Sequence, residues 1–280
     1  MNVSAALDSA AEVLRSSEVA EYRREAASLL AFVLGKDDVF LVAHPEYQLS
    51  PEQLDRYQKV VKRRSDREPF QYIVGSQEFY ALAFRVSPDV LIPRPETEIL
   101  VEAAIDQLIK NDASRFCEIG VGSGCISIAI VYNAANTRGV GVDISPRALE
   151  VARSNAETHG VTDRLDLRLG NVFEGITGEF DLIVSNPPYV PDDQLEVLQA
   201  EVRQFEPHTA LAGGASGLEV IERIIAEAQH FLVPGGVLLM EIGFDQSERV
   251  SRLFDTGIWT ELKFLPDLQG IQRIMFARCR

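Results

Sequence analysis

Apolar residues recur at helical spacing through the N-terminal part of the chain. Alanine, leucine and valine follow an i, i+3, i+4 pattern over residues 4–15 and 18–34, and Gly35 is placed to end the second helix. A third helix is predicted from Ser50–Gln53, where a serine N-cap precedes a proline in the first turn and a glutamine at the third position. The pattern therefore predicts a small all-α domain over residues 1–68.

The pattern changes after this helical region. The segments Y-I-V-G at Tyr72–Gly75 and F-Y-A-L-A-F-R-V at Phe79–Val86 are typical of short strands. A β-hairpin or linker is therefore predicted over residues 69–90. A helix is predicted to follow over residues 95–110.

From residue 114 onward, strand-like and helix-like segments alternate. Strands are predicted at residues 115–119, 139–142, 165–169, 180–185, 237–242, 258–265 and 271–278. Helices are predicted at residues 125–133, 145–159, 192–203, 216–231 and 245–254, and Pro234–Gly236 is predicted as a turn. Alternating β and α units imply a mostly parallel sheet with helices on both faces. The last two strands have no helix between them and predict an antiparallel edge strand, so residues 91–280 are expected to form one α/β domain.

Composition adds few constraints. The chain has 280 residues, of which 46% are hydrophobic and 25% charged, as in an ordinary folded protein. Its apolar runs are far shorter than the roughly 18 residues of a membrane helix, and the first residues do not have the pattern of a signal peptide. The three cysteines and four histidines show no metal-ligand spacing and no disulfide set. A cytoplasmic protein with no metal and no membrane partner is therefore expected.

Negative charge is concentrated in the α/β part of the sequence. The net charge is −15. Residues 1–85 carry 11 lysines and arginines against 13 acidic residues, whereas residues 86–280 carry 16 against 29. An acidic surface repels nucleic acid backbones and suits cationic ligands or basic protein surfaces. Solubility alone is an equally good explanation of this charge.

A glycine-rich turn, E-I-G-V-G-S-G at Glu118–Gly124, follows the first strand of the α/β part. Its three glycines allow sharp turning and close approach of a ligand, and ligands of such sheets bind beyond the carboxyl ends of the strands. The spacing differs from the dinucleotide pattern G-x-G-x-x-G, and the turn lacks the lysine of a triphosphate site. A turn that serves packing alone is the simpler alternative.

Two further segments fit an adenosine ligand. Asp143 ends the second strand, where an acid can hold both hydroxyls of a ribose; alternatively, it helps to cap the helix that follows Ser145. Asn171 and Val172 follow the third strand, where an adenine would lie between an amide and an apolar wall, although an ordinary loop fits them equally well. The glycine spacing, the lack of basic groups for a pyrophosphate and the acidic site favour S-adenosylmethionine, whose sulfonium cation Glu118 would tolerate.

The segment S-N-P-P-Y at Ser185–Tyr189 ends a buried strand, because proline cannot donate to a strand ladder. This strand is expected beside the glycine-turn strand, so that N-P-P-Y projects over the methyl donor. The Oδ1 atom of Asn186 and the carbonyl oxygen of Pro187 can each accept one N–H of a planar amide or aromatic amine, and the rigid Pro188 helps to fix their direction. Such acceptors orient a weakly nucleophilic nitrogen and stabilise the positive charge that develops on it as the methyl group arrives. Tyr189 offers an aromatic face on which the planar group can stack. A proline-rich turn that merely ends the strand is the alternative.

The glycine turn, Asp143 and N-P-P-Y together resemble the class I S-adenosylmethionine-dependent methyltransferases that act on exocyclic or amide nitrogens. Within these, nearly the whole chain is similar to the HemK/PrmC family of peptide-chain release factor glutamine methyltransferases. Further motifs that carry the resemblance are Arg67–Gly75, Val90–Glu98, Glu206–Gly214 and Leu239–Gly243. The resemblance implies a Rossmann-like methyltransferase fold with a small helical N-terminal domain that helps to recognise the substrate.

The resemblance also implies a reaction and the residues that perform it. The substrate would be the glutamine of a Gly-Gly-Gln loop in class 1 release factors, methylated at its side-chain N5 nitrogen, with S-adenosylhomocysteine as the second product. Residues that would bind the substrate are Asn186, Pro187, Pro188, Tyr189 and Arg94, with Arg94 and Pro95 by the mouth of the site. Of these, Asn186, Pro187 and Tyr189 would be catalytic. Residues that would bind the cofactor are Glu118, Gly120, Val121, Gly122, Ser123, Gly124, Asp143, Asn171, Val172 and Asn186. The family commonly has D-L-G-T-G-S-G at the glycine turn, so Val121 replaces a hydroxyl-bearing residue here.

Three alternatives remain open. A glutamine methyltransferase of a ribosomal protein would share these motifs. A DNA adenine N6-methyltransferase also uses N-P-P-Y, but it would need a basic groove for a flipped base, and the net charge of −13 over residues 86–280 argues against one. A protein that binds the cofactor without activity is disfavoured by the intact Asn186 and Asp143. A monomer that binds class 1 release factors and no nucleic acid directly is expected.

Overall fold

The computed structural model describes residues 1–110 and 115–280, so residues 111–114 of the predicted α/β domain lie outside the described part. The chain divides into two compact units. The helical unit consists of Met1–Ser76 and Gln199–Phe205, and the sheet unit consists of Gln77–Leu198 and Glu206–Arg280. Among the described residues, no helix is long and apolar enough to cross a membrane.

The helical unit is built around three amphipathic helices. Its helices are α1 (Val3–Ser16), α2 (Tyr22–Leu34), α3 (Asp38–Ala43), α4 (Pro51–Ser65), α5 (Phe70–Val74) and α9 (Ala200–Phe205). Leu14, Leu29 and Leu30 are fully buried in its core, and each such side chain stabilises the fold by about 1.5–3 kcal/mol. The predicted start of α4 is confirmed, because the backbone and side chain of Ser50 and those of Gln53 form a reciprocal capping box. Gly35 ends α2 with a φ of 62°, also as predicted.

Two predictions for this unit were wrong. Tyr72–Val74, predicted as a strand, belongs to α5, which starts after Pro69 and ends at Gly75 with a φ of 76°. A run of three apolar residues is too short to show a period, and so it cannot separate a strand from a helical turn. The helix predicted from residue 18 begins only at Tyr22.

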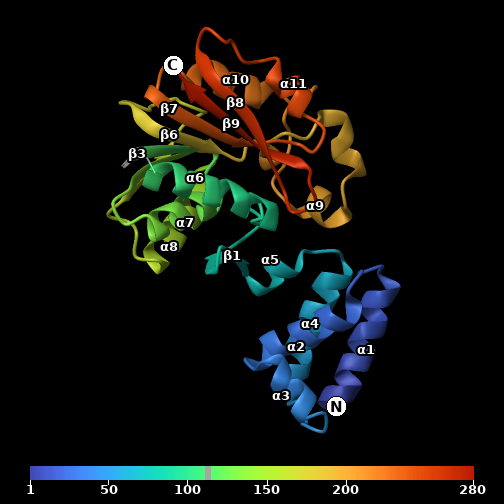
Figure 1. Cartoon of the computed structure of the whole chain (residues 1–280). Helices are drawn as coiled ribbons and strands as arrows, with labels where there is room; N and C mark the ends of the chain where they lie inside the picture. The colour runs from blue at the N-terminus through green and yellow to red at the C-terminus, as the bar shows by residue number, and fades with distance from the viewer. Residues whose placement is uncertain (111–114) are drawn as a thin grey trace. The chain divides into compact units, whose positions relative to one another are not determined.

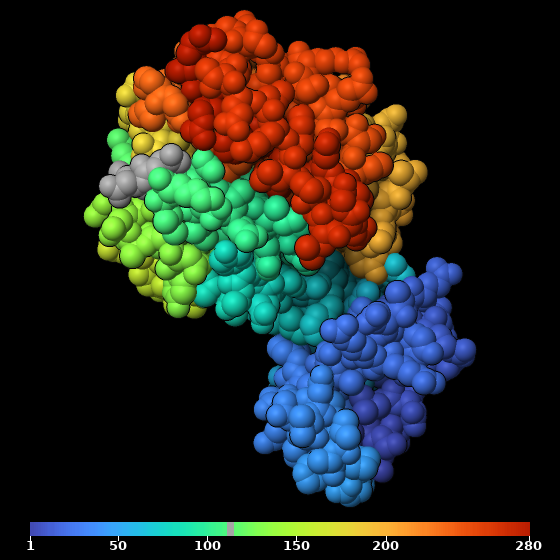
Figure 2. All heavy atoms as spheres, viewed as in Figure 1, coloured from blue at the N-terminus to red at the C-terminus, as the bar shows by residue number. Residues whose placement is uncertain are grey.

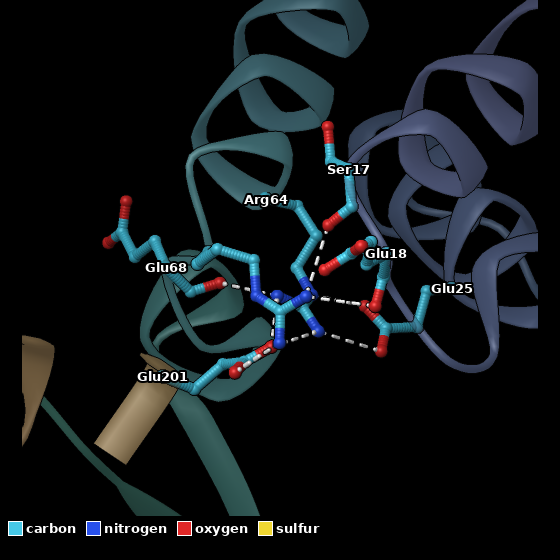
Figure 3. A network of polar contacts seen from close by, with 7 residues as sticks. Ser17, Glu18, Glu25, Arg64, Glu68 and Glu201 are labelled. Carbon is cyan, nitrogen blue, oxygen red and sulfur yellow. Dashed lines mark hydrogen bonds and ion pairs between the residues drawn. The ribbon is translucent and has the colours of Figure 1, made fainter. Parts of the chain in front are cut away.

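A cluster of charged side chains holds α9 within the helical unit (Figure 3). Arg64 lies between Glu25 and Glu201, and it donates to Oε1 of Glu201 from both Nη atoms at 3.1 Å. Arg67 donates to the other oxygen of Glu201 at 2.7 Å. The side chain of Arg64 is only 7% exposed, so its charge is compensated by these carboxylates rather than by water. The chain therefore leaves the sheet unit after Leu198, contributes α9 to the helical unit, and returns.

The sheet unit begins with a hairpin and continues as a seven-stranded sheet. The hairpin strands are β1 (Ser76–Phe79) and β2 (Leu82–Arg85), joined by Tyr80 and Ala81 with φ values of 51° and 58°, as in tight hairpin turns. The large sheet has the order β5-β4-β3-β6-β7-β9-β8. Its strands are β3 (Arg115–Ile119), β4 (Arg138–Asp143), β5 (Leu165–Leu169), β6 (Phe180–Ser185), β7 (Leu232–Glu241), β8 (Trp259–Pro266) and β9 (Gln272–Cys279).

The predicted fold class is confirmed. Strands β3 to β7 pair in parallel, and β9 runs antiparallel to both β7 and β8. The antiparallel strand thus lies one position inside the edge, which is formed by β8. Figure 2 shows the residues of β8 and β9, coloured red, as part of the surface of this unit.

Helices cover both faces of the sheet (Figure 1). The helices of this unit are α6 (Glu98–Lys110), α7 (Cys125–Asn133), α8 (Pro146–Thr158), α10 (Glu219–Ala228) and α11 (Ser247–Ser251), with 3₁₀ turns η1 (Pro95–Thr97), η2 (Asp192–Val197) and η3 (His208–Ala210). Successive residues of β6 enter opposite cores: Leu182 and Val184 pack in the core beneath α6 and α7, and Ile183 packs in the core beneath α10. This alternation follows from the two-residue period of a strand.

Two further element predictions were wrong. The helix predicted over residues 192–203 is broken into η2 and α9, because Leu198 has an extended backbone with a ψ of 156°. Pro234–Gly236, predicted as a turn, lies inside β7, where the register against β6 shifts. An interruption of the ladder accommodates proline, which cannot donate a ladder hydrogen bond.

Candidate active site

The strand order reverses between β3 and β6. From β3 the chain moves outward through β4 to β5, and it then crosses back to place β6 on the other side of β3. Ile119 and Ser185 end these two strands in register, and the predicted adjacency of the strands is confirmed. Ligands of open α/β sheets bind in the crevice at such a reversal.

A cleft of about 390 Å³ opens at this position, a volume typical of small-molecule sites. Sequence-predicted residues that line it are Arg94, Gly120, Val121, Gly122, Ser123, Asp143, Asn171, Val172, Asn186, Pro187 and Pro188. Apolar side chains complete the walls, among them Ile126, Ile144, Val220 and Ile224. All of these residues belong to the sheet unit.

The glycine turn is held against β4 by its own backbone. The amides of Gly120 and Val121 both donate to the carbonyl of Val142, at 2.8 and 3.2 Å. Gly120 has a φ of 78°, and a Cβ there would project to 3.9 Å from the carbonyl oxygen of Asn186. The bare backbone therefore leaves the space between the turn and N-P-P-Y free.

Two other residues, Gly124 and Val121, explain the composition of this turn. Gly124 has a φ of 82°, and an added Cβ would lie 2.9 Å from Ile128, so this glycine allows close packing of α7. Val121 packs over Gly141, where a Cβ would lie 2.6 Å from its Cγ2 atom. A valine at this position thus contributes to packing.

Asp143 connects the turn to the helix that follows it. Its Oδ2 atom accepts from the amide of Gly122 and its Oδ1 atom from the amide of Ser145, both at 2.8 Å. The hydroxyl of Ser145, rather than Asp143, caps α8 by accepting from Ala148. Burial raises the pKa of Asp143, and the backbone hydrogen bonds oppose this rise. A carboxylate has about four lone-pair sites, so both oxygens retain acceptor capacity.

Glu118 lies behind the turn rather than in the cleft. It is fully buried, and its Oε2 atom accepts from the amide of Ser127 at 3.0 Å and from the hydroxyl of the same residue. Its Oε1 atom has no hydrogen-bond partner among the described residues. Burial raises the pKa of Glu118 to about 8, so the carboxyl is mostly protonated at pH 7. Glu118, predicted to tolerate the sulfonium cation, is thus not part of the cleft lining.

The predicted adenine loop is strained. Val172 has a φ of 59°, which is unfavourable for a β-branched residue. Asn171 reaches away from this strained residue, because its Oδ1 atom accepts from Nη1 of Arg223 at 2.9 Å. The side chain of Val172 can thus provide an apolar wall, whereas the side-chain oxygen of Asn171 is already hydrogen-bonded to Arg223 of α10.

The N-P-P-Y segment divides into two parts. Asn186, Pro187 and Pro188 line the cleft. Tyr189 packs against the core beneath α10, and its hydroxyl donates to Oε1 of Glu241 at 3.4 Å. Burial raises the pKa of the Tyr189 hydroxyl well above its usual range. Tyr189 is therefore partly buried against this core, and its role in stacking stays a prediction.

Comparison with known proteins identifies the family. The family descriptions "PrmC N-terminal domain" and "Methyltransferase small domain" match residues 5–75 and 96–206. The chain is 38% identical to the release factor glutamine methyltransferase of Koribacter versatilis over 99% of both chains. It is 42% identical to that of Geobacter sulfurreducens over 95% of this chain and 92% of the relative. The chain belongs to the release factor glutamine methyltransferase family.

A solved structure supports the fold independently. The T. thermophilus 16S rRNA N2 G1207 methyltransferase in complex with AdoMet and guanosine aligns with a TM-score of 0.54 at 19% identity. The alignment covers 73% of this chain and 50% of that one. The match is at the level of fold, and family membership makes the chain an enzyme, a methyltransferase.

Two residues that the sequence did not single out contact the N-P-P-Y segment of this methyltransferase. The Nδ2 atom of Asn186 donates to Oγ1 of Thr97 at 3.2 Å, and Oγ1 of Thr97 donates to Oε2 of Glu241 at 2.6 Å. Thr97 and Glu241 are 2% and 3% exposed. Their only sequence signal is their place in the family motifs I-P-R-P-E-T-E and L-M-E-I-G.

Arg94 is also fixed by a partner that sequence reasoning did not pair with it. Its Nη2 atom donates to Oε1 of Glu206, whose Oε2 atom accepts from the amide of Ile92 at 3.3 Å. Pro95, predicted at the mouth with Arg94, is exposed at the start of η1. Within residues 1–110 and 115–280, no three histidine, cysteine or acidic side chains are grouped to hold a metal ion.

Proposed function

We propose that this enzyme transfers a methyl group from S-adenosylmethionine to the side-chain N5 nitrogen of the glutamine in the Gly-Gly-Gln loop of class 1 release factors. The observation that carries the proposal is the direction of the Asn186 side chain. Its amide nitrogen is bound to Thr97, so its oxygen is the atom left for a ligand, and the cleft that Asn186 lines also contains the glycine turn.

The residues of the cleft fit S-adenosylmethionine. Its methionine end would lie along Gly120–Gly124, where a Cβ on Gly120 would fill the space facing Asn186. Asp143 would accept hydrogen bonds from the ribose hydroxyls with the lone pairs that Gly122 and Ser145 leave free. Val172 and Ile224 would provide apolar surface for the adenine. No phosphate has to be neutralised, in agreement with a turn that lacks basic side chains.

S-adenosylmethionine would supply an electrophilic methyl group: its carbon–sulfur bond breaks, the sulfur keeps the electron pair, and S-adenosylhomocysteine remains. The chain's task is to present the acceptor nitrogen. An amide nitrogen is a poor nucleophile because its lone pair is delocalised into the carbonyl group. Oδ1 of Asn186 and the carbonyl oxygen of Pro187 would each accept one of its two hydrogens.

Such a pair of acceptors acts in two ways. It fixes the plane of the glutamine amide, so that the nitrogen faces the methyl carbon. It also stabilises the positive charge that builds on the nitrogen as the new bond forms, because both dipoles are already oriented. One amide proton is released after transfer, and the product nitrogen keeps one hydrogen and the methyl group.

The proposed reaction also suggests where the enzyme is located and how it holds its substrate. Release factors act on the ribosome, so we place the enzyme in the cytoplasm. We also propose that the enzyme is active as a monomer. The helical unit, which matches the PrmC N-terminal domain, would contribute to holding the release factor.

The test is incubation of the enzyme and S-adenosylmethionine with a class 1 release factor, followed by mass spectrometry. The expected result is a single added methyl group on the glutamine of the Gly-Gly-Gln loop. A release factor with alanine in place of that glutamine is the matched control, and a ribosomal protein fraction and duplex DNA should run in parallel. Methylation of either of these substrates, with none on the release factor, would overturn the proposal.

A further inference from the structure

Asn186 is the end of a series of three hydrogen-bonded side chains, of which Thr97 and Glu241 are buried. The carboxylate of Glu241 accepts from Thr97, and the hydroxyl oxygen of Thr97 accepts from Asn186. The second oxygen of Glu241 accepts from the hydroxyl of Tyr189. Thr97 and Glu241 come from η1 and from the end of β7, which are far apart in the sequence.

The direction of these hydrogen bonds follows from which of the three side chains carry hydrogens to donate. A threonine hydroxyl has one hydrogen, and an ionised Glu241 has none. Burial raises the pKa of Glu241, and the hydrogen bond from Thr97, the charge of Arg273 and the hydroxyl of Tyr189 oppose this rise; the direction is that of the ionised form. Because Thr97 uses its hydrogen on Glu241, its oxygen can only accept from Asn186. Asn186 must therefore turn its NH₂ group toward Thr97, and its oxygen points the other way.

A rotated side chain of Asn186 would be costly. Its Oδ1 atom would then face the oxygen of Thr97, and one of the buried acceptors would lose its only donor. A buried polar group without a partner costs about 1–3 kcal/mol. Without these hydrogen bonds, the oxygen and the NH₂ group of the Asn186 side chain are nearly equivalent in shape, so packing alone would not select between the two orientations.

We propose that Thr97 and Glu241 are positioning residues that hold the Asn186 side chain with its oxygen toward the substrate amide. The inference rests on the proposed function, in which that oxygen accepts a hydrogen of the glutamine. Glu241 is not part of the cleft lining, and Thr97 lines the cleft beside Asn186 but uses its hydroxyl on Glu241 and Asn186. They act by excluding the orientation in which Asn186 would present an NH₂ group to the NH₂ group of the acceptor.

The kinetic test uses three substitutions in the full chain. Thr97→Val keeps the shape of the side chain but removes the hydroxyl, Thr97→Ser keeps the hydroxyl, and Glu241→Gln adds a donor that allows the chain to reverse. We expect kcat for release factor methylation to fall about 10²-fold in Thr97→Val, the scale of misplacing a reacting group. Thr97→Ser should stay within about threefold of the wild type, because it retains the hydroxyl that sets the direction.

The expected pattern separates positioning from a structural role. Affinity for S-adenosylmethionine, measured by calorimetry, and the melting temperature should match between Thr97→Ser and Thr97→Val, while kcat differs. Glu241→Gln should lose kcat without losing affinity for the cofactor. Equal kcat in Thr97→Ser and Thr97→Val would overturn the inference.

A second measurement does not depend on activity. A neutron structure of the wild-type protein should show the Thr97 deuteron directed at Glu241 and an Asn186 deuteron directed at Thr97. The opposite directions would overturn the inference even in an active enzyme. If the wild-type enzyme leaves release factors unmethylated while the deuterons lie as expected, the proposed function fails and the orientation of Asn186 stands.

Discussion

The hydroxyl of Ser185 donates a hydrogen bond of 2.7 Å to the carbonyl oxygen of Ile119. These two residues end β6 and β3, and the glycine turn and N-P-P-Y follow them directly. The bond therefore joins the two segments that form opposite walls of the cleft. It lies in the protein interior, where Ser185 is fully buried.

Replacement of Ser185 by alanine should destabilise the protein by about 1–3 kcal/mol, because the buried carbonyl of Ile119 would lose its donor. Urea unfolding measures this change. Ser251→Ala is the matched control, since its hydroxyl bonds to a carbonyl at an exposed site, and little change is expected there. Similar stability losses in the two variants would show that the buried hydrogen bond of Ser185 stabilises the protein no more than the exposed one of Ser251.

Replacement of Asn186 by alanine should abolish most methyl transfer but leave cofactor binding intact. Loss of one preoriented group at a reacting centre typically lowers kcat about 10²–10³-fold. Single-turnover methylation and calorimetric titration with S-adenosylmethionine measure the two effects. Asn133→Ala is a control, since that amide bonds to the carbonyl of Ala129 within α7. A folded Asn186→Ala variant with near wild-type turnover would refute the role assigned to this side chain.

Gly124→Ala should destabilise the protein more than Gly160→Ala. Both glycines have a positive φ, 82° and 66°, and an alanine there costs about 1–2 kcal/mol in backbone strain. At Gly124 the new Cβ would also lie 2.9 Å from Ile128 and 3.2 Å from Ala152, whereas at Gly160 it would meet no atom within 4 Å. Overpacking adds about 1–3 kcal/mol. Chemical denaturation of both variants tests the difference, and equal stability would contradict it.

Glu118 should make the stability of the fold fall as the pH rises. Its folded-state pKa is raised from 4.5 to about 8, so between these values the native state holds a proton that the unfolded chain has released. The free energy of unfolding then decreases with pH across this window, by up to about 1.4 kcal/mol per unit. Glu118→Gln removes the titration. Urea unfolding at pH 5.5 and 7.5 should show a loss of about 2 kcal/mol in the wild type relative to the variant; parallel behaviour would exclude a buried neutral Glu118.

Arg64→Ala should destabilise the helical unit by about 3–5 kcal/mol, because it leaves Glu25 and Glu201 without their shared partner in a partly buried site. Arg24→Ala is the control. Its ion pair with Glu21 is exposed, and such pairs contribute little. Thermal unfolding should separate the two variants clearly, and similar melting temperatures would show that water compensates Glu25 and Glu201 after the loss of Arg64.

Features that depend on neighbouring residues could be predicted from the sequence. The capping box of Ser50 and Gln53, the glycine at the end of α2 and the strands before each motif are set by local chemistry, and the structure has them. The position of β6 beside β3 followed from the rules of parallel sheets. The cleft therefore brings together most residues predicted to bind the two ligands.

Features that depend on distant partners could not be predicted. Glu118 was predicted to tolerate the sulfonium cation, but it is fully buried behind the turn, and burial, which the sequence does not display, raises its pKa to about 8. The contact between the hydroxyl of Tyr189 and Glu241 was not predicted, because these residues are 52 positions apart. The contact between Thr97 and Asn186 joins residues 89 positions apart, and neither side chain alone carries a signal for the other.

The path of the chain through α9 limits how this enzyme can be divided. A truncation after residue 76 would separate Arg64 and Arg67 from Glu201, and the remaining fragment would carry α9 without the helices that it packs with. Exchange of the N-terminal region between relatives must therefore transfer two stretches of sequence together. Evolution of one stretch is constrained by the other, so Arg64 and Glu201 are expected to change as a pair.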